Sequence, residues 1–483
     1  MDRPHPRAPG ATALLSWIAL AVCLGGCGPN GEGASGPDTH PPVVVLLLDT
    51  LRPSVLGSYG GDAELAPALD RIAAEGVRFE AAQSPASFTI PAVASLLSGV
   101  HTWHHGTWDW NHALPAGLPT WPERFAAAGY RTAAVVHTPN GSARFGFDRG
   151  FERWVDQWKP RRAADEVLPR LDELLAEDDG RPLFLWLHIL EPHEPYHPPA
   201  PFAGRHDPDY DGEVTGDPEL LWQIRKRELV PSARDVEHLR AEYADNVAWV
   251  DSVVGRVRAR LEAAGLWDAA VVAVVSDHGE GFLEHDGVTH AGMGHGSTVY
   301  DEMVRVPLLL KLPGDEGAFA GLVVEEPVAS FDLLATVASL AGVEADAVGA
   351  AAGDAGPRDL RPLVEAAAAA SSATPMGDRL LFTHSQSHGA DGLAPTYGVR
   401  RGAWKLVHTA GHPPELYDLA ADPGETRDVA AEHPNIVGFL LERLLAQLAT
   451  GSAGAGAAAV DPESLDPETL RHLQELGYLM GDR

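Results

Sequence analysis

The sequence has few cysteines and a shortage of positive charge. Its 483 residues contain only two cysteines, both within the first 27 positions, so the remainder of the chain has no disulfide bonds. Lysine and arginine number 36 against 68 aspartate and glutamate residues, which gives a net charge of −32. This balance argues against nucleic-acid binding through a basic surface. The sequence indicates no particular protein partner.

Residues 1–27 have the pattern of a lipoprotein signal peptide. A start with two arginines precedes an apolar run at 11–24 that is short for a transmembrane span. The run leads into L-G-G-C, which resembles a bacterial lipobox and predicts that Cys27 is lipidated. We expect an exported protein anchored by lipid to a bacterial membrane, in the periplasm or at the cell surface. The alternative is an ordinary secretory signal or an uncleaved anchor. Residues 28–42, which are rich in Gly and Pro, are expected to form a flexible tether.

Four apolar runs end directly in aspartate or histidine. Unbroken runs of this kind are typical of strands buried on both faces of a parallel sheet. Helical patterns lie between them, so the sequence predicts an α/β fold with a large, mainly parallel β-sheet flanked by helices. Active sites in such sheets lie at the carboxyl ends of the strands, which makes these polar residues candidates. The runs are 43–48 before Asp49, 133–136 before His137, 183–187 before His188, and 270–276 before Asp277 and His278.

The domain organisation follows from changes in composition. Residues 43–343 form the predicted catalytic domain, within which the polar segment 203–235 is expected to be a surface insertion. Residues 344–374 are mostly Ala, Gly and Asp and are interpreted as a linker or loop. Short alternating runs in 375–450 predict a small antiparallel β-sheet plus a helix, and 451–483 a tail with a short helix.

The stretch 87–106 contains a candidate nucleophile. Pro91 near the start and Gly99 at the end bound a short helix over 90–98. The hydroxyl of Thr89 is thereby placed at a helix N-terminus, where unpaired N–H groups favour negative charge. A threonine before a helix is also a common N-cap, so both roles are open at this point.

Taken together and in order, eight motifs resemble those of sulfatases and sulfatase-like hydrolases of the alkaline phosphatase superfamily. They are L-L-L-D-T-L-R-P-S-V-L-G-S-Y-G (46–60), L-D-R-I-A-A-E-G-V-R-F (69–79), A-S-L-L-S-G (94–99), E-P-H-E-P-Y-H-P-P (191–199), S-D-H-G-E (276–280), H-G-S-T-V-Y-D-E-M-V-R-V-P-L (295–308), W-K-L (404–406) and E-L-Y-D-L-A-A-D-P-G-E (415–425). The resemblance covers nearly all of the chain from Val43. It implies a large α/β domain with a smaller antiparallel C-terminal domain.

The resemblance also implies a metal site. By position, Asp49, Asp277 and His278 are expected to be metal ligands, with Thr89 as the nucleophile and a further ligand. Carboxylates, one imidazole and a hydroxyl suit one divalent ion, either Ca²⁺, Mg²⁺, Mn²⁺ or Zn²⁺. The ion would lower the pKa of the hydroxyl and neutralise an anionic ester substrate.

Four further histidines are candidate substrate-binding residues. His193 and His295 fall where the family has residues that contact substrate. They are expected to be catalytic, by binding the anionic oxygens or by protonating the leaving oxygen. For His105 and His137, substrate binding competes with a purely structural role.

Two departures from the family pattern bear on the chemistry. Classical sulfatases carry C/S-x-P-x-R, whose first residue becomes formylglycine, whereas this chain has Thr89 and Val93 in T-x-P-x-V. Thr50 stands where members often have a second aspartate, which argues for a single metal ion. The resemblance then implies a hydrolase of sulfate or of phosphate or phosphonate esters that works without formylglycine.

Two alternatives to the hydrolase stay open. Members with an unmodified threonine include phosphoethanolamine transferases and lipoteichoic acid synthases, which implies phospho-group transfer as one alternative. The chain lacks the transmembrane bundle that accompanies most such transferases, and this favours the hydrolase. A non-catalytic relative that binds anionic glycans is the other alternative.

Overall fold

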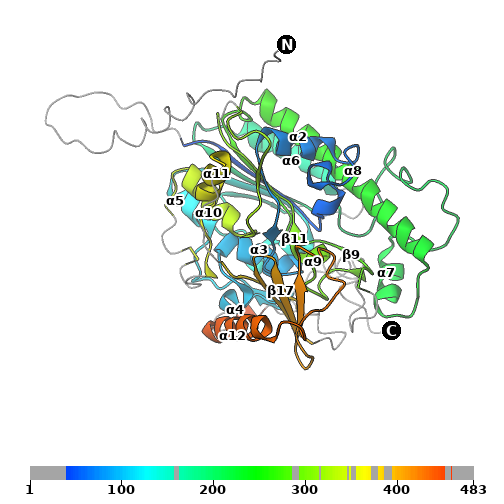
Figure 1. Ribbon diagram of the computed structural model, residues 1–483. Coiled ribbons are helices and arrows are strands. Elements are labelled where there is room, and N and C mark those ends of the chain that lie inside the picture. The colour runs from blue at the N-terminus through cyan, green and yellow to red at the C-terminus, as the bar shows by residue number, and fades with distance from the viewer. Residues whose placement is uncertain are drawn as a thin grey trace, which may run out of the picture. The chain divides into compact units, whose positions relative to one another are not determined.

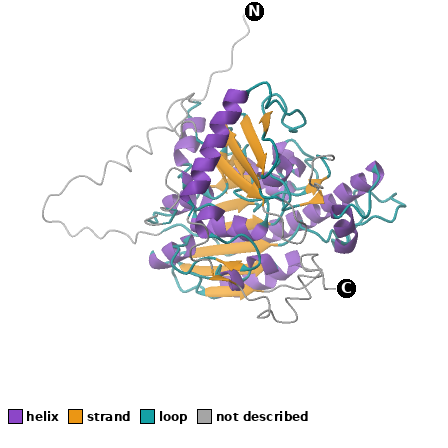
Figure 2. Cartoon of the chain, turned by 90° about the horizontal axis from the view of Figure 1, so that it is seen from below, coloured by secondary structure: helices purple, strands orange, loops and turns teal. Residues whose placement is uncertain are grey.

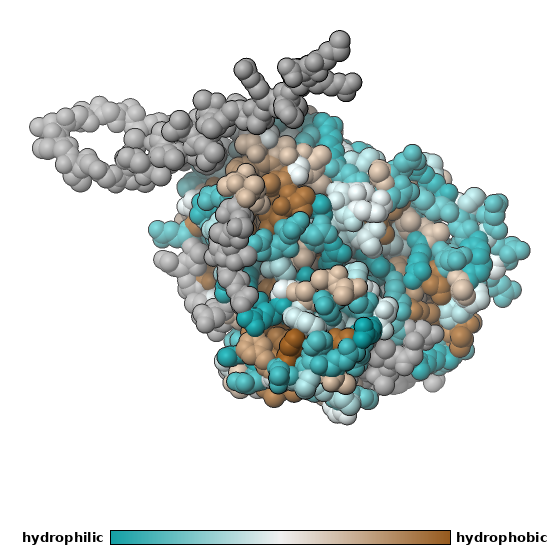
Figure 3. Space-filling model, viewed as in Figure 1, coloured by the Kyte–Doolittle hydropathy of each residue, from teal (hydrophilic) through white to brown (hydrophobic). Residues whose placement is uncertain are grey.

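The computed structural model describes residues 40–156, 163–285, 293–314, 317–344, 348–349, 355–370, 379–385, 394–451 and 458–459. The predicted signal peptide with Cys27, most of the tether and the predicted tail helix lie outside the described residues. Among the helices that are described, none is long and apolar enough to cross a bilayer. The face drawn in Figure 3 is mostly hydrophilic, with smaller separate hydrophobic areas.

An eight-stranded sheet forms the centre of the large domain. Its order is β13-β2-β12-β8-β1-β7-β5-β6, and within it only β12 runs antiparallel to its neighbours. The strands are β1 (Val43–Leu48), β2 (Val77–Phe79), β5 (Arg131–His137), β6 (Arg153–Asp156), β7 (Leu183–Ile189), β8 (Val271–Val275), β12 (Leu308–Lys311) and β13 (Leu322–Val324). The four apolar runs of the sequence are the four adjacent strands β8, β1, β7 and β5, each wholly buried. The predicted fold class is confirmed.

Helices cover both faces of this sheet (Figures 1 and 2). Along β1, Val43, Val45 and Leu47 join one buried apolar cluster, while the alternate residues join the other. The first cluster includes residues of α3 (Thr89–Ser98), α5 (Trp121–Ala127), α10 (Asp332–Leu340) and α11 (Arg361–Ala368). The second includes residues of α2 (Pro67–Glu75), α6 (Ala163–Ala176) and α8 (Ala233–Ala263). Burial on both sides explains why the strands read as unbroken apolar runs.

The C-terminal subdomain is a four-stranded antiparallel sheet with one helix, as predicted. The strands are β15 (Leu381–Ser385), β16 (Thr396–Arg401), β17 (Trp404–Thr409) and β18 (Glu415–Asp418), and α12 (Pro434–Thr450) packs on β16 and β17. The sheet also touches the segment that leads into α3, because the N–H of Ser87 donates to the carbonyl oxygen of His384 at 3.1 Å. The two parts of the chain therefore meet just before Thr89.

Two segments without a helical pattern in the sequence contain helices. The predicted surface insertion contains α7 (Pro218–Arg225), and α8 begins within it at Ala233 behind a capping box formed by Ser232. The predicted linker contains α11, whose Leu363 and Val364 are buried in the main core. The interpretation of residues 344–374 as a linker or loop is therefore wrong over α11, because burial of a few apolar residues stabilises a helix that composition alone does not reveal.

The remaining elements are short. Small sheets join β11 with β3 and β14, β10 with β9, and β19 with β4. The strands are β3 (Ala82–Gln83), β4 (His112–Ala113), β9 (Gly281–Phe282), β10 (Met293–Gly294), β11 (Arg305–Val306), β14 (Val328–Ala329) and β19 (Ala458–Ala459). The short helices are η1 (Pro53–Val55), η2 (Gly57–Tyr59), η3 (Pro139–Gly141), η4 (Ala143–Phe145), α4 (Thr102–His105) and α9 (Asp301–Val304).

Candidate active site

The candidate site lies at the carboxyl ends of the central strands. Asp49 directly follows β1, and Asp277 and His278 follow the neighbouring strand β8. Thr89 is the first residue of α3, on the face of the sheet that this helix covers. All four side chains are completely buried. The structure thus brings together the four residues that the sequence predicts to hold a metal ion.

The imidazole of His278 lies at the centre of this group. Its Nε2 is 3.1 Å from the Oγ1 of Thr89, 3.4 Å from Oδ2 of Asp277 and 3.7 Å from Oδ1 of Asp49. Its Nδ1 is 2.9 Å from the carbonyl oxygen of Gly279. Because a carbonyl oxygen only accepts, Nδ1 carries the proton, and in the neutral ring Nε2 offers a lone pair to the site.

Backbone groups fix the orientation of the second carboxylate. Oδ1 of Asp277 accepts hydrogen bonds from the N–H of His278 at 2.9 Å and the N–H of Thr50 at 3.2 Å. Thr50 has a positive φ of 58°, an uncommon conformation for a β-branched residue, and its carbonyl accepts from the hydroxyl of Tyr243 at 2.8 Å. Oδ2 of Asp277 has no hydrogen bond within the described part of the chain and faces the site.

The buried carboxylates of Asp49 and Asp277 would be stabilised by a bound cation. Burial, followed by the proximity of Asp277, raises the pKa of Asp49 well above its usual range. Neither oxygen of Asp49 has a hydrogen-bond donor among the described residues. Two neighbouring buried carboxylates, with three of their four oxygens lacking a donor among the described residues, are costly unless a positive charge is shared between them. Donor atoms of Asp49, Asp277 and His278 all lie within 4.8 Å of one another, so this set fits a divalent ion.

The sequence analysis places His188 among the polar residues at the strand ends but assigns it no role, and the structure brings it to the site. It lies in β7 beside Leu47 of β1, and its Nε2 is 3.6 Å from Oδ2 of Asp49. Burial lowers its pKa to about 4, so the ring is neutral at pH 7. The backbone of Gly141 approaches the ring so closely that a Cβ there would lie 2.6 Å from Nδ1. Its position at the carboxyl end of a strand next to β1 is the signal that could have identified it.

The predicted substrate histidines form a row with His278. The ring centroids of His193 and His295 are 4.7 Å apart, and those of His295 and His278 are 4.6 Å apart. Nδ1 of His193 donates to the carbonyl oxygen of Glu194 at 2.6 Å, and burial lowers the pKa of this ring to about 4. Nδ1 of His295 lies 3.1 Å from Oε1 of the buried Glu280. The structure therefore places both histidines beside the candidate metal site.

Two other histidines differ in their surroundings. His137 is completely buried at the end of β5, and its proximity contributes to the lowered pKa of His188 on the next strand. His105 instead accepts the N–H of Thr107 at Nδ1 and contacts Ser95 Oγ at Nε2, both at 3.0 Å. Those described contacts engage both nitrogens of His105 within the protein, which supports the structural alternative for this residue.

The N-cap alternative for Thr89 is not what the structure shows. Phe88 occupies the N-cap position of α3, no side chain caps the helix, and Thr89 is its first residue. The hydroxyl of Thr89 reaches His278 instead. Its position at the N-terminus of a ten-residue helix provides a favourable potential for negative charge on the oxygen.

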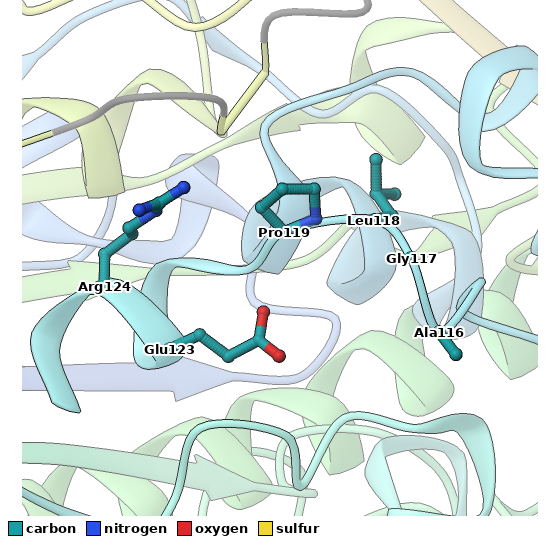
Figure 4. A pocket seen from close by; sticks show the side chains of 6 residues that line it. All are labelled: Ala116, Gly117, Leu118, Pro119, Glu123 and Arg124. Carbon is teal, nitrogen blue, oxygen red and sulfur yellow. The ribbon is translucent and has the colours of Figure 1, made fainter. Parts of the chain in front are cut away.

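A separate surface pocket of about 320 Å³ lies at the start of α5 (Figure 4). Its lining residues are Ala116, Gly117, Leu118, Pro119, Glu123 and Arg124. The carboxylate of Glu123 is engaged by the N–H and hydroxyl of Thr120 at 2.8 and 3.1 Å, as part of the helix cap. This pocket contains none of the candidate catalytic residues.

Comparison with known proteins identifies the family of this chain. The family described as Sulfatase matches residues 41–343, and the family described as N-sulphoglucosamine sulphohydrolase, C-terminal, matches residues 293–450. The chain is 24% identical to arylsulfatase K of Rattus norvegicus over 493 residues, covering 89% of this chain and 82% of that protein. Two solved structures, each of a protein 20% identical to this chain, are similar to it in fold. One is a protein in complex with its substrate D-glucosamine-2-N,6-O-disulfate, with a TM-score of 0.70 over 86% of this chain and 100% of the other. The other is a phosphonate monoester hydrolase of Agrobacterium radiobacter, with a TM-score of 0.65 over 87% and 100%.

Proposed function

Because the chain belongs to the sulfatase family, a family of ester hydrolases, we propose that it is a metal-dependent hydrolase of anionic esters with Thr89 as its nucleophile. The observation that carries this proposal is the buried hydroxyl of Thr89, 3.1 Å from Nε2 of His278 and at the N-terminus of α3. Relatives and structural neighbours include sulfatases and a phosphonate monoester hydrolase. The substrate is accordingly a sulfate, phosphate or phosphonate ester.

One divalent ion, Ca²⁺, Mg²⁺, Mn²⁺ or Zn²⁺, would be held by Asp49, Asp277, His278 and the hydroxyl of Thr89. When bound, this ion would lower the pKa of the hydroxyl and neutralise charge on the ester. The protein's own contribution is to hold four donors in a dry site before the substrate arrives.

The hydrogen bonds of the two substrate histidines assign them different tasks. His193 is neutral with its proton on Nδ1, so its Nε2 accepts hydrogen bonds and cannot protonate a leaving group. Glu280 faces Nδ1 of His295. When Glu280 carries a proton and donates it to Nδ1, the proton of the neutral His295 ring lies on Nε2. His295 is therefore the proton donor of the pair.

The reaction then has two displacements. Thr89 reacts as the alkoxide, so its Oγ1 forms a bond to sulfur or phosphorus as the bond to the leaving oxygen breaks, and the leaving oxygen takes its proton from His295. In the second displacement water attacks the esterified Thr89, returns one proton to His295 and restores the Thr89 oxygen. A sulfated threonine lacks the escape route that the hydrate of formylglycine provides. For this reason we propose that phosphorus esters are preferred over sulfate esters.

The test is hydrolysis of matched 4-nitrophenyl sulfate, phosphate monoester, phosphate diester and phosphonate, with each of the four divalent ions. Thr89→Ala should reduce kcat by at least about 10³-fold, whereas Thr89→Ser, which keeps a hydroxyl, should retain measurable activity. A phosphoryl adduct on Thr89, detected by mass spectrometry after an acid quench, would identify the nucleophile directly.

Other outcomes would redirect the proposal. Faster turnover of the sulfate would show that the preference for phosphorus is wrong. Label on an acceptor hydroxyl instead of in water would indicate the transferase. No turnover of any ester by metal-loaded protein would count against the hydrolase and favour the glycan-binding alternative.

A further inference from the structure

The helix α7 in the inserted segment reaches the active site through one side chain, Arg225. This residue is the last of α7, and its side chain is 16% exposed. Its Nη2 is paired with the carboxylate of Glu194, which is completely buried. Its Nε donates to the carbonyl oxygen of Met293 at 3.2 Å. The two nitrogens thus hold two segments that are about a hundred residues apart in the sequence.

Each of these segments carries one of the substrate histidines. Glu194 directly follows His193, and its carbonyl oxygen accepts the Nδ1–H of that ring. Met293 belongs to β10, and His295 is the residue that follows this strand. In Figure 1, α7 lies beside β9, the strand that pairs with β10, and α7 packs on β10 itself. Arg225 therefore joins the segment that contains His193 to the segment that contains His295.

The backbone around Arg225 is shaped to admit the guanidinium. Gly294 has a φ of +77°, and a Cβ at this position would collide with the Nη2 and Cζ of Arg225. Only glycine satisfies both conditions without strain. The planar guanidinium presents Nε and Nη2 in a fixed geometry, which a lysine ammonium cannot reproduce with a single nitrogen.

The backbone of the segment that contains His193 is also held in place, by a second residue. The side-chain amide of the buried Asn246 in α8 donates to the carbonyl oxygens of Pro192, His193 and Pro195 at 3.2–3.4 Å. This segment is thus held by α8 through its backbone and by α7 through the Glu194 side chain. For the His295 segment, Arg225 adds a link to this framework beside the pairing of β10 with β9.

We propose that Arg225 is a positioning residue that sets the placement of His295 relative to His193 by joining the segments that carry them. The proposal rests on the hydrolase function proposed above, in which His295 protonates the leaving oxygen. It makes the insertion that contains α7 part of the catalytic apparatus.

The test compares Arg225→Met and Arg225→Lys with a matched control, Arg256→Met, which removes another arginine–carboxylate pair. Arg256 lies on α8 and is 46% exposed in its pair with Asp165. The first measurement is hydrogen–deuterium exchange of the segments 191–196 and 293–300 in the full protein. We expect faster exchange in both segments for Arg225→Met, an intermediate effect for Arg225→Lys and wild-type rates for the control.

The second measurement is kcat for a nitrophenyl ester and for the corresponding phenyl ester. Because phenolate is more basic than nitrophenolate, its departure depends more strongly on protonation by His295. Misplacing His295 should reduce kcat about 100-fold for the phenyl ester and about 10-fold or less for the nitrophenyl ester in Arg225→Met. A merely structural role would lower both rates equally. If Arg225→Met does not fold, Arg225→Lys carries both measurements.

The outcomes separate this inference from the proposed function. Wild-type exchange rates in both segments, or equal losses for the two esters, would overturn the role of Arg225. If the wild-type protein hydrolyses no ester at all, the proposed function fails. The exchange measurement then still decides the linkage: unchanged exchange in Arg225→Met refutes it, and faster exchange in both segments supports it.

Discussion

Replacement of Asp49 by asparagine should have opposite effects on two stabilities. It should preserve or raise the stability of the metal-free protein at pH 7, and it should remove most of the stability that a bound ion adds. Both oxygens of Asp49 lack hydrogen-bond donors among the described residues, and burial with the nearby Asp277 raises its pKa. A carboxyl group whose folded pKa is raised stabilises the fold at low pH and loses that contribution as the pH rises through the folded pKa. The metal-free wild type should therefore lose stability towards neutral pH. Metal-free Asp49→Asn should lose less stability over the same pH range, and at pH 7 it should be at least as stable as the metal-free wild type.

The effect of the ion can be estimated from its concentration and the size of the fold. An ion present at 100 times its Kd stabilises the folded protein by about 2.7 kcal/mol. The compact unit begins at His40 and contains roughly 440 residues. At about 2.1 cal/mol/K per residue, its unfolding entropy is about 0.9 kcal/mol/K. The expected rise in Tm is thus about 3 °C for the wild type, and below about 1 °C for Asp49→Asn at the same ion concentration.

Scanning calorimetry after chelation, with and without each of the four divalent ions, measures both quantities. Asp251→Asn is a matched control, because Asp251 is also a buried carboxylate, but it binds the N–H groups of Ala68 and Leu69 at the start of α2. This control should keep the full metal-dependent shift. An equal shift in Asp49→Asn would refute Asp49 as a ligand. No shift in the wild type with any of the four ions would refute the metal site itself.

Three further predictions concern the pH dependence of stability, the buried ion pairs of Lys405 and the attachment of the protein to a membrane. Burial raises the pKa of Glu242 to about 7, so its contribution to stability is lost as the pH rises through about 7, and Glu242→Gln should raise Tm at pH 8 by about 2 °C. Lys405 is completely buried between Asp301 and Glu425 at 2.7 and 2.8 Å, so Lys405→Met should destabilise the fold by about 3–5 kcal/mol in calorimetry. We also propose that Cys27 carries the lipid anchor, so Cys27→Ser should move the protein from the membrane to the soluble fraction.

Each of these predictions has an opposing result. An equal pH dependence of Tm in wild type and Glu242→Gln would contradict the first. The exposed pair of Arg427 with Glu432 is the control for the second, and Arg427→Met should cost less than about 1 kcal/mol. A similarly small effect of Lys405→Met would contradict the role of the buried ion pairs. Retention of Cys27→Ser in the membrane would contradict lipidation at that residue.

The central sheet and most of the site could be predicted because their signals are local. The apolar run before Asp49 identifies a strand, and the residue after a strand in a parallel sheet lies at the functional edge. The same reasoning applies to Asp277. The placement of Thr89 followed from Pro91 and Gly99, although the structure puts Thr89 inside the helix and not at its cap.

The parts that were missed depend on contacts between distant segments. His188 reads as the end of a strand, and its approach to Asp49 follows from the strand order, which a single sequence does not reveal. Arg225 lies in a polar segment without strong periodicity. Its significance comes from Glu194 and from the backbone of Met293, neither of which marks the arginine in the sequence.

Thr50 has a consequence for the charge of the substrate. Its backbone N–H supports Asp277, but its side chain adds no carboxylate to the group formed by Asp49, Asp277 and His278. Two carboxylates cancel the charge of one divalent ion, so the loaded centre is neutral until Thr89 loses its proton. Such a centre has little net positive charge left for an ester, and a doubly charged phosphate monoester needs more of it than a singly charged ester does. By this charge balance, we expect the singly charged phosphonate monoester and phosphate diester to be hydrolysed faster than the phosphate monoester in the panel of nitrophenyl esters.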